Sequence, residues 1–307
     1  MNAIEVTNLT KKFGAFTSVD NVSFTIKEGE IFGFLGANGA GKSTTIRMLC
    51  GILSPTSGDA LVGGYSIVHD SNSVKKNIGY MSQKFSLYND LSVEENINFF
   101  GKIYGLSGNQ LTERKNWVLD VANLIGKEKI ITGSLPGGIK QRLALGTAVI
   151  HKPKIVFLDE PTSGVDPISR RNFWNLINAL SEEGITVFVT THYLEEAEYC
   201  NNIILIDSGK IVAEGKPKEL KTKYIKNNIF EVETDEPIKA LELLSAKDFV
   251  DEINIFGNNL HVSFKESSDG LEKMHALFSS NDLIIRKTEI ITPTLEDVFI
   301  HLLDKKK

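Results

Sequence analysis

The sequence has few of the residues that would tie it to an oxidising compartment or to nucleic acid. It holds two cysteines, Cys50 and Cys200, in 307 residues. This is too few for a disulfide framework and favours a reducing cytoplasm, with both thiols as small core residues. The net charge is −5, whereas proteins that bind nucleic acid through its phosphates are usually basic, so no nucleic-acid partner is expected. The one dense basic run, Lys305 to Lys307, is interpreted as a solvated tail.

Long apolar segments are also missing. The longest apolar runs are short pieces such as Ile155 to Leu158, whereas a helix that spans a bilayer needs about 20 apolar residues. The first residues, Met1 to Glu5, show no basic region followed by an apolar one, so no signal peptide is expected. If the protein acts at a membrane, a separate chain must therefore cross it.

The composition that remains is ordinary for a globular protein. Apolar residues make up 41% and charged residues 24%, which suits a buried core, and the length favours two domains. Strand-like and helix-like segments alternate from residue 4 to about 225, which predicts an α/β fold with a mainly parallel sheet covered on both faces. Continuous apolar runs predict buried parallel strands at 30–35, 154–158 and 185–189. Residues 203–212 are predicted to form a β-hairpin.

The sequence from residue 223 onward predicts a second, smaller domain. A lysine-rich polar stretch precedes it, and we place the boundary so that the domains are 1–222 and 223–307. The order strand, helix, strand, strand, helix, strand is that of a ferredoxin-like α+β sandwich, with elements expected at 229–233, 237–244, 249–256, 260–264, 271–279 and 283–289. A final helix is expected to begin with Thr292 as its N-cap and Pro293 at its first position. We favour a dimerisation or regulatory role for this domain.

The clearest motif is a glycine-rich loop between a buried strand and a helix-like segment. In such a phosphate-binding loop, backbone N–H groups and a helix N-terminus surround the phosphates. Lys42 is expected to reach the outer phosphates of a nucleotide, and the hydroxyl of Ser43 to hold Mg²⁺. The loop and the residue that continues it are Gly36, Ala37, Asn38, Gly39, Ala40, Gly41, Lys42, Ser43 and Thr44.

Two adjacent carboxylates, Asp159 and Glu160, follow the strand at 154–158. Ligands bind at the carboxyl ends of the strands in such sheets. Asp159 is expected to bind Mg²⁺ directly or through water, and Glu160 to orient the attacking water as general base. Such a pair alone also fits a strand that simply ends in a turn. After a phosphate-binding loop, it indicates nucleotide hydrolysis.

Over residues 1–220 these motifs, in this order, resemble ABC-type ATPases. The resemblance implies a P-loop NTPase fold with a parallel core sheet, an antiparallel β subdomain and a helical subdomain, and it implies ATP and Mg²⁺ as ligands. Phe13 matches the aromatic that stacks on adenine, although it also fits a core position. Gln83 matches the Q-loop glutamine that contacts Mg²⁺ and water. His192 matches the catalytic switch histidine at the γ-phosphate, and Asp166 matches the D-loop at the dimer interface.

Residues 135–142 occupy the place of the family's signature, with one departure. The usual signature opens Leu-Ser-Gly-Gly, and Pro136 stands here in place of the serine. In the family that serine donates its hydroxyl to the γ-phosphate of ATP on the opposite subunit, whereas proline has neither a hydroxyl nor an N–H to donate. Gly137 and Gly138 still offer backbone donors at a helix start and are expected to bind that ATP.

The resemblance also implies partners. Each family site combines the P-loop of one subunit with the signature of another, which implies a head-to-tail dimer with a second copy or with a paralogous ATPase. The segment after Gln83 is expected to receive a helix of an integral membrane permease, with Phe85, Leu87 and Tyr88 as anchors, although local packing explains these side chains equally well. The chain is then expected in the cytoplasm, held at the inner face of the membrane through its permease.

Export is favoured over import, because residues 292–299 are similar to the tail of ATPases in drug- and antibiotic-exporter systems. The alternative is a non-transport ABC ATPase of translation or DNA repair. Such proteins usually carry two ATPase domains or a long coiled-coil insertion, and neither is visible in the sequence. An RNA-binding role for the second domain is also open, but its first strand lacks the paired exposed aromatics of an RNA-recognition sheet.

Overall fold

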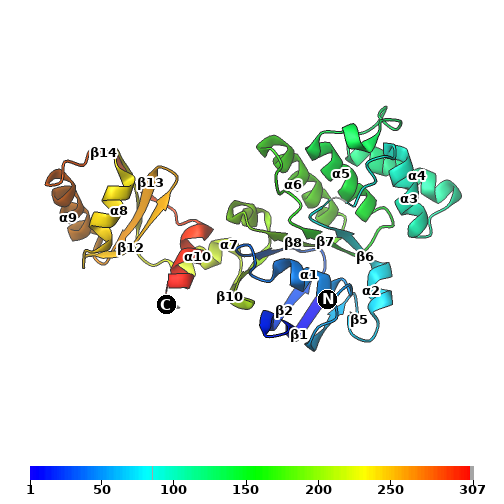
Figure 1. The fold of residues 1–307 in the computed structure, drawn as a ribbon, viewed down its shortest axis with the longest axis horizontal. Coiled ribbons are helices and arrows are strands. Elements are labelled where there is room, and N and C mark those ends of the chain that lie inside the picture. Colours follow the sequence, from blue (N-terminus) through cyan, green and yellow to red (C-terminus); the bar gives the residue numbers. More distant parts are fainter. Residues whose placement is uncertain (85, 305–307) are drawn as a thin grey trace. The chain divides into compact units, whose positions relative to one another are not determined.

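The short apolar runs of the first part of the chain form the strands of a six-stranded sheet (Figure 1). The computed structural model describes residues 1–84 and 86–304. The chain divides by its internal contacts into two units, Met1–Pro217 and Lys218–Lys307. The predicted boundary after residue 222 falls inside helix α7 (Pro217–Tyr224).

The six-stranded sheet of the first unit has the order β10-β9-β3-β8-β7-β6. All neighbouring pairs are parallel except the β9–β10 hairpin, which confirms the predicted parallel core. Its strands are β3 (Ile31–Leu35), β6 (Ile78–Met81), β7 (Ile155–Asp159), β8 (Thr186–Thr191), β9 (Asn202–Asp207) and β10 (Lys210–Gly215). Every residue of β3, β7 and β8 is buried, which explains their unbroken apolar runs.

The register of these strands fixes where the functional loops lie. Leu35 at the end of β3 pairs with Thr191 at the end of β8. Asp159 at the end of β7 pairs with Thr190 of β8. The loops that follow β3, β7 and β8 therefore open on one edge of the sheet, which is the edge where parallel sheets bind ligands.

A second, antiparallel sheet packs against the first through aromatic side chains. Its order is β2-β1-β4-β5, with β1 (Asn2–Phe13), β2 (Phe16–Lys27), β4 (Ser57–Val62) and β5 (Tyr65–Ser66). The ring centroid of Phe24 in β2 lies 5.8 Å from that of Phe32 and 5.7 Å from that of Phe34, both in β3. Such ring pairs add about 0.5–1.5 kcal/mol each beyond the area they bury, so the cluster fixes one sheet on the other.

Helices complete the first unit. α3 (Val93–Ile103), α4 (Gly108–Val121) and α5 (Gly137–Ala148) pack on one another, and α5 also contacts α6 (Pro167–Glu182). The remaining helical segments are α1 (Lys42–Leu49), α2 (Ser71–Asn77), η1 (Thr132–Ser134) and η2 (Leu194–Tyr199). The unit thus has the parallel core, the antiparallel sheet and the helical group that were expected. Within residues 1–84 and 86–304, no helix is long and apolar enough to cross a membrane.

The second unit is a four-stranded antiparallel sheet of order β12-β13-β11-β14. Its elements are β11 (Ile229–Thr234), α8 (Pro237–Ser245), β12 (Val250–Phe256), β13 (Asn259–Phe264), α9 (Ser267–Ser279) and β14 (Ile285–Ile291). This is the predicted ferredoxin-like topology. Alternate residues of the central strands pack with residues of the two helices into one core, which includes Phe230, Val232, Ala240, Leu244, Leu260, Val262, Phe264, Met274 and Phe278.

The last helix, α10 (Leu295–Asp304), lies on the other face of this sheet. His261 of β13 alternates with the core residues Leu260 and Val262, so its side chain points to that other face. Its Nδ1 lies 2.8 Å from Oδ1 of Asp297 in α10. His301 of the same helix contacts Glu252 of β12. Two histidine–carboxylate contacts therefore attach α10 to the sheet.

The start of α10 corrects one prediction. The N-cap is Thr294 and not Thr292, and Pro293 precedes the helix. The N–H of Asp297 donates to Thr294 Oγ1 at 3.1 Å, and the Asp297 carboxylate accepts from the Thr294 N–H at 2.7 Å. This reciprocal pairing satisfies two backbone donors at once, and it outweighs the preference of proline for the first helical position.

We predict that Asp297→Ala lowers the free energy of opening of α10 and its sheet by about 2–4 kcal/mol. The substitution removes both the N-terminal cap of the helix and the hydrogen-bond partner of a buried imidazole. Burial tends to raise the pKa of Asp297, but hydrogen bonds from His261 and Thr294 outweigh it and hold the pKa below 3.8. A lowered folded-state pKa means that this stabilisation is complete above about pH 4 and is lost as the pH falls through the folded value.

Amide hydrogen exchange of the intact chain measures this effect, with peptides from β13 and α10 as the readout. Glu296→Ala is the matched control, since Glu296 is the exposed acid next in sequence. Equal protection in the two variants would contradict the proposed role of Asp297.

Candidate functional site

The loop between β3 and α1 needs glycine at defined places. Gly41 has a φ of +107°, and a side chain there would meet the carbonyl oxygen of Ser18 at 2.5 Å. A side chain at Gly36 would lie 2.2 Å from the carbonyl oxygen of Ile206. Glycine therefore lets the loop turn tightly under neighbouring backbone. The loop ends at the N-terminus of α1, where free N–H groups favour an anion.

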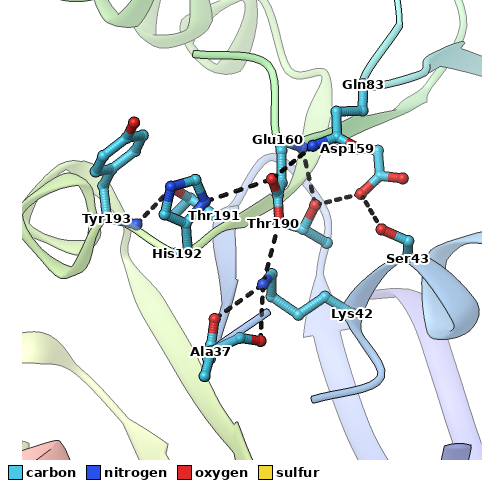
Figure 2. Close-up of polar contacts among 11 residues, drawn as sticks. Ala37, Lys42, Ser43, Gln83, Asp159, Glu160, Thr190, Thr191, His192 and Tyr193 are labelled. Atoms are coloured by element: carbon cyan, nitrogen blue, oxygen red, sulfur yellow. Dashed lines mark hydrogen bonds and ion pairs between the residues drawn. The ribbon is translucent and has the colours of Figure 1, made fainter. Parts of the chain in front are cut away.

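Lys42, at the start of α1, turns back into this loop. Its ammonium donates to the carbonyl oxygens of Gly36 at 2.8 Å and Ala37 at 3.1 Å, and Nζ lies 3.1 Å from Oε1 of Glu160 (Figure 2). The side chain is buried. A buried ammonium held at a glycine-rich loop is the arrangement that binds the outer phosphates of a nucleotide.

Asp159 lies between two hydroxyl groups. Ser43 donates to its Oδ1 at 3.0 Å and Thr190 donates to the same oxygen at 2.7 Å. Burial raises the pKa of Asp159, and these two hydrogen bonds oppose the rise. The described residues contain no group of three or more metal-ligating His, Cys, Asp or Glu residues. A hydroxyl beside one carboxylate still fits Mg²⁺, which keeps several waters and takes its other ligands from phosphates.

Glu160 is held in an unusual backbone conformation, with a φ of +45°. Left-handed backbone at a residue other than glycine costs about 1–3 kcal/mol and persists where its surroundings enforce it. The N–H of Glu160 donates to Thr190 Oγ1 at 3.0 Å, and the next residue, Pro161, accepts a short hydrogen bond from Nε2 of Gln141 in α5. The turn thereby aims the carboxylate at the loop after β3.

Three side chains meet the carboxylate of Glu160. Besides Lys42, Gln83 Nε2 donates to Oε2 at 2.9 Å. Nδ1 of His192 lies 3.4 Å from the same oxygen, which is an ion-pair distance without hydrogen-bond geometry. Figure 2 shows these groups converging from the ends of β6, β7 and β8. A carboxylate that a histidine and a glutamine approach in this way has the geometry of a general base.

A cleft of about 440 Å³ collects eight of the predicted site residues together with Phe16 and Ser18. It is lined by Phe16, Ser18, Asn38, Gly39, Gly41, Lys42, Ser43, Thr44, Gln83 and Glu160. Thr44 accepts a hydrogen bond from Ser18 at 2.9 Å. Phe13 is half exposed and pairs with Phe16 across the β1–β2 turn, but it does not line the cleft. Nζ of Lys11 lies 5.2 Å from the centre of the Phe13 ring.

The signature and D-loop residues lie elsewhere, since none of them lines this cleft. Asp166 is the N-cap of α6 and accepts from the Ser169 N–H at 2.9 Å, which lowers the pKa of its carboxyl. Gly138 packs so closely on α6 that a side chain would lie 2.4 Å from Ser169 Oγ, whereas the space beside Gly137 is open. These residues therefore do not contribute to the cleft beside the loop after β3.

Pro136 is the N-cap residue of α5. Its side chain accepts no capping hydrogen bond, but its carbonyl oxygen accepts from the N–H groups of Ile139 and Lys140 at 3.0 Å each. The proline thus leaves the helix start intact, and what it removes is the hydroxyl and the backbone N–H that a serine would present.

The sequence patterns missed Phe16, Ser18, Thr190 and Gln141. Ser18 and Phe16 belong to a strand far from the loop in sequence, and nothing local marks them. Thr190 had a usable signal, because it directly follows the strand predicted at 185–189, at the carboxyl end where ligands bind in such sheets.

Comparison with known proteins places three family models on the chain. The model of the family described as "ABC transporter" matches residues 19–163, and the model described as "ATP-binding protein DrrA1-3-like, C-terminal domain" matches residues 215–303. A third model, described as "AAA domain, putative AbiEii toxin, Type IV TA system", matches residues 134–196.

Two curated relatives show the extent of the similarity. The chain is 34% identical to the linearmycin resistance ATP-binding protein LnrL of Bacillus subtilis over 304 residues, which is 97% of each chain. It is 52% identical over 220 residues to the probable multidrug ABC transporter ATP-binding protein YbhF of Escherichia coli. That match covers 72% of this chain and 38% of YbhF, so the chain spans well under half the length of that relative.

A solved structure gives the same answer for the fold. The ATP-binding cassette MJ0796, a dimer in a post-hydrolysis state bound to ADP and Pi, superposes with a TM-score of 0.63 at 29% identity, covering 69% of this chain and 98% of that one. The first unit is therefore a P-loop NTPase of the ABC type. The chain belongs to the ATP-binding proteins of the ABC transporter family, as its motifs implied.

We predict that Phe13→Ala weakens ATP binding about tenfold, since stacking of a base on an aromatic ring is worth about 1–3 kcal/mol. Fluorescent-nucleotide titration of the intact chain measures the dissociation constant. Phe16→Ala is the matched variant, because both rings stand at the ends of one hairpin. A larger loss in Phe16→Ala would assign the stacking to the ring that lines the cleft.

We also predict that Pro136→Ser hydrolyses ATP at least as fast as the wild type, because it restores a hydroxyl donor at an intact helix start. Steady-state phosphate release is the measurement. Pro136→Ala separates the hydroxyl from the loss of the ring. A clear loss of activity in both variants would show that the proline shapes the loop.

Proposed function

We propose that this chain is the ATP-hydrolysing subunit of an exporter, and that two ATPase subunits close head to tail on ATP to drive a separate membrane permease. The observation that carries the proposal is the convergence of Lys42, Glu160, Gln83 and His192 on one edge of the parallel sheet. Family membership supports the nucleotide, and the geometry supports the roles given to these residues below.

Hydrolysis follows from how these residues are placed. The loop and Lys42 bind the outer phosphates of ATP, and Ser43 and Asp159 would hold Mg²⁺, which would supply positive charge against the negative charge that develops on the phosphate. Once the phosphates draw Lys42 away, the Glu160 carboxylate is free to orient a water as general base. His192 lies beside that carboxylate and is placed to contact the γ-phosphate.

The dimer is supported by where the signature lies. Gly137, Gly138 and Asp166 do not line the cleft beside the loop after β3 of the same chain. Gly137 and Gly138 stand at the start of α5, where free N–H groups attract anions. A second subunit in head-to-tail orientation gives these groups a phosphate to bind. The partner is a second copy or a paralogous ATPase.

A hydrophobic hollow beside the Q-loop supports a permease partner. It has a volume of about 90 Å³ and is lined by Tyr80, Met81, Ser86, Leu87, Phe100, Tyr104, Ala144, Thr147 and Ala148. Leu87 is nearly buried in it, whereas Tyr88 is half exposed and packs edge-on against Phe99 at 4.8 Å. Leu87 thus has a packing role as well, Tyr88 remains the candidate anchor, and Phe85 lies outside the described residues.

Export and location rest on the relatives. LnrL is named for linearmycin resistance and YbhF as a probable multidrug transporter protein, and the chain matches LnrL through the second unit as well. We therefore place the chain in the cytoplasm, at the inner face of the membrane through its permease. The relatives do not favour a role in translation or repair.

We predict that Glu160→Gln is trapped as an ATP-bound dimer. The amide keeps the contact with Gln83 but cannot act as a base, so ATP stays intact between the subunits. Light scattering after size exclusion, with and without MgATP, measures the mass. Phosphate release should fall by at least about 100-fold, the lower range of general-base effects.

Lys42→Ala in the Glu160→Gln background is the matched control, because it removes the phosphate contact and should remain monomeric. A Glu160→Gln protein that binds ATP but stays monomeric at saturating MgATP would contradict the two-subunit site.

A further inference from the structure

The first turn of α6 contacts three functional segments at once. Asp166, in the D-loop, caps it. Ser169 packs against the signature glycine Gly138. Arg170 reaches the segment that carries the switch histidine, His192. One turn of helix thus links the residues that face a second subunit to the residues that face the chain's own ATP.

Arg170 is held by a buried carboxylate. Its Nε lies 3.5 Å from Oε1 of Glu196, whose side chain is only 2% exposed. Among the described residues no hydrogen-bond donor reaches either oxygen of that carboxylate. An unpaired buried charge is strongly unfavourable, so the guanidinium of Arg170 is kept beside Glu196 by electrostatics.

The same guanidinium lies over an aromatic ring next to the switch. The central carbon of the Arg170 guanidinium is 4.3 Å from the ring centroid of Tyr193, a cation–π arrangement that holds the ring in place. The tyrosine ring in turn lies 4.1 Å, centre to centre, from the ring of His192. Figure 2 shows the side chains of Tyr193, His192 and Glu160 in a row. His192 Nδ1 is 3.4 Å from Glu160 Oε2.

The backbone of this segment adds a second restraint. The Tyr193 N–H donates to Thr191 Oγ1 at 3.0 Å, which restrains the backbone that carries both rings at the end of β8. The His192 ring therefore stands on a restrained backbone and is contacted by the tyrosine ring.

From these contacts we propose that Arg170 is a positioning residue, which holds His192 for hydrolysis through the ring of Tyr193 and so couples the D-loop and signature of a subunit to its own switch histidine. The proposal rests on the ATPase function proposed above. Arg170 touches neither the nucleotide cleft nor Glu160, and it acts only through the two rings.

The proposal predicts a split between turnover and binding. Arg170→Met and Tyr193→Leu should each lower kcat about tenfold or more, because misplacing a reacting group by about 1 Å can slow a reaction by up to about 100-fold. KM for ATP and the affinity for ATP should stay within about twofold, since uniform binding is untouched. Tyr193→Phe keeps the ring face and should retain activity, and Arg170→Lys should retain part of it.

A double-mutant cycle tests whether the residues act in one line. If Arg170 works through Tyr193, the double variant Arg170→Met/Tyr193→Leu should be no slower than the slower single variant. In a His192→Ala background, Arg170→Met should cause no further loss. Additive losses in either cycle would overturn the proposal. Arg171→Met is the matched control, since Arg171 is the exposed neighbour on the same helix.

A second measurement does not depend on activity. In protein with labelled histidine rings, the NMR resonance of His192, assigned by its absence in His192→Ala, should shift in Arg170→Met and stay in place in Arg171→Met. An unmoved resonance would refute positioning even if ATP hydrolysis is confirmed. A wild-type chain that binds ATP without hydrolysing it would refute the proposed function and leave the resonance to decide the positioning.

Discussion

The buried ion pair between Lys42 and Glu160 is the contact on which the site depends. The lysine follows β3 and the glutamate follows β7, with β8 between them, and the two side chains are only 4% and 8% exposed. Removing one partner of such a pair leaves a buried charge, which costs about 3–5 kcal/mol. Each charge therefore keeps the other in place. In the ATPase that we propose, the phosphates of ATP would pair with the lysine instead, which would leave the Glu160 carboxylate to orient water.

Sequence patterns predicted the parts of the site whose residues are neighbours in the chain. The loop at residues 36–43 and the strand that ends in Asp159 and Glu160 were identified because their chemistry requires neighbouring residues of fixed type. The side chains that contact these segments could not be predicted from the sequence, because sheet register and helix packing bring Thr190, Gln141 and Ser18 to the site. Arg170 and Tyr193 are 23 positions apart in the sequence, and only the packing of α6 beside the end of β8 reveals their contact. The wrong N-cap of α10 has the same origin. Two threonines flank Pro293, and the choice between them is made by the carboxylate of Asp297, whose own position depends on His261.

The second unit uses its sheet in a way that limits its functions. One face carries α8 and α9 over an apolar core. The other face carries α10, which is attached through His261 to Asp297 and through His301 to Glu252. Sheets that recognise single-stranded RNA need one open face on which bases can stack. Here part of that face is covered by a helix, and Glu231 beside His261 adds negative charge. A phosphate backbone is poorly accommodated there, which favours contacts with protein and supports the dimerisation or regulatory role that we propose for this unit.

Pro136, which stands in place of the signature serine, changes how much the signature would contribute to the free energy of ATP binding in the proposed dimer. Loss of one hydroxyl donor to a charged phosphate removes about 1.5–3 kcal/mol of interaction. Two features limit this loss. The proline has a φ of −56°, close to the value its ring imposes, so the helix start is fixed before any nucleotide arrives and less conformational entropy is lost on closing. The start of α5 also keeps its backbone donors beside an open space at Gly137. In the dimer that we propose, such a signature would bind the opposite nucleotide through these donors and the helix dipole, without the hydroxyl of a serine.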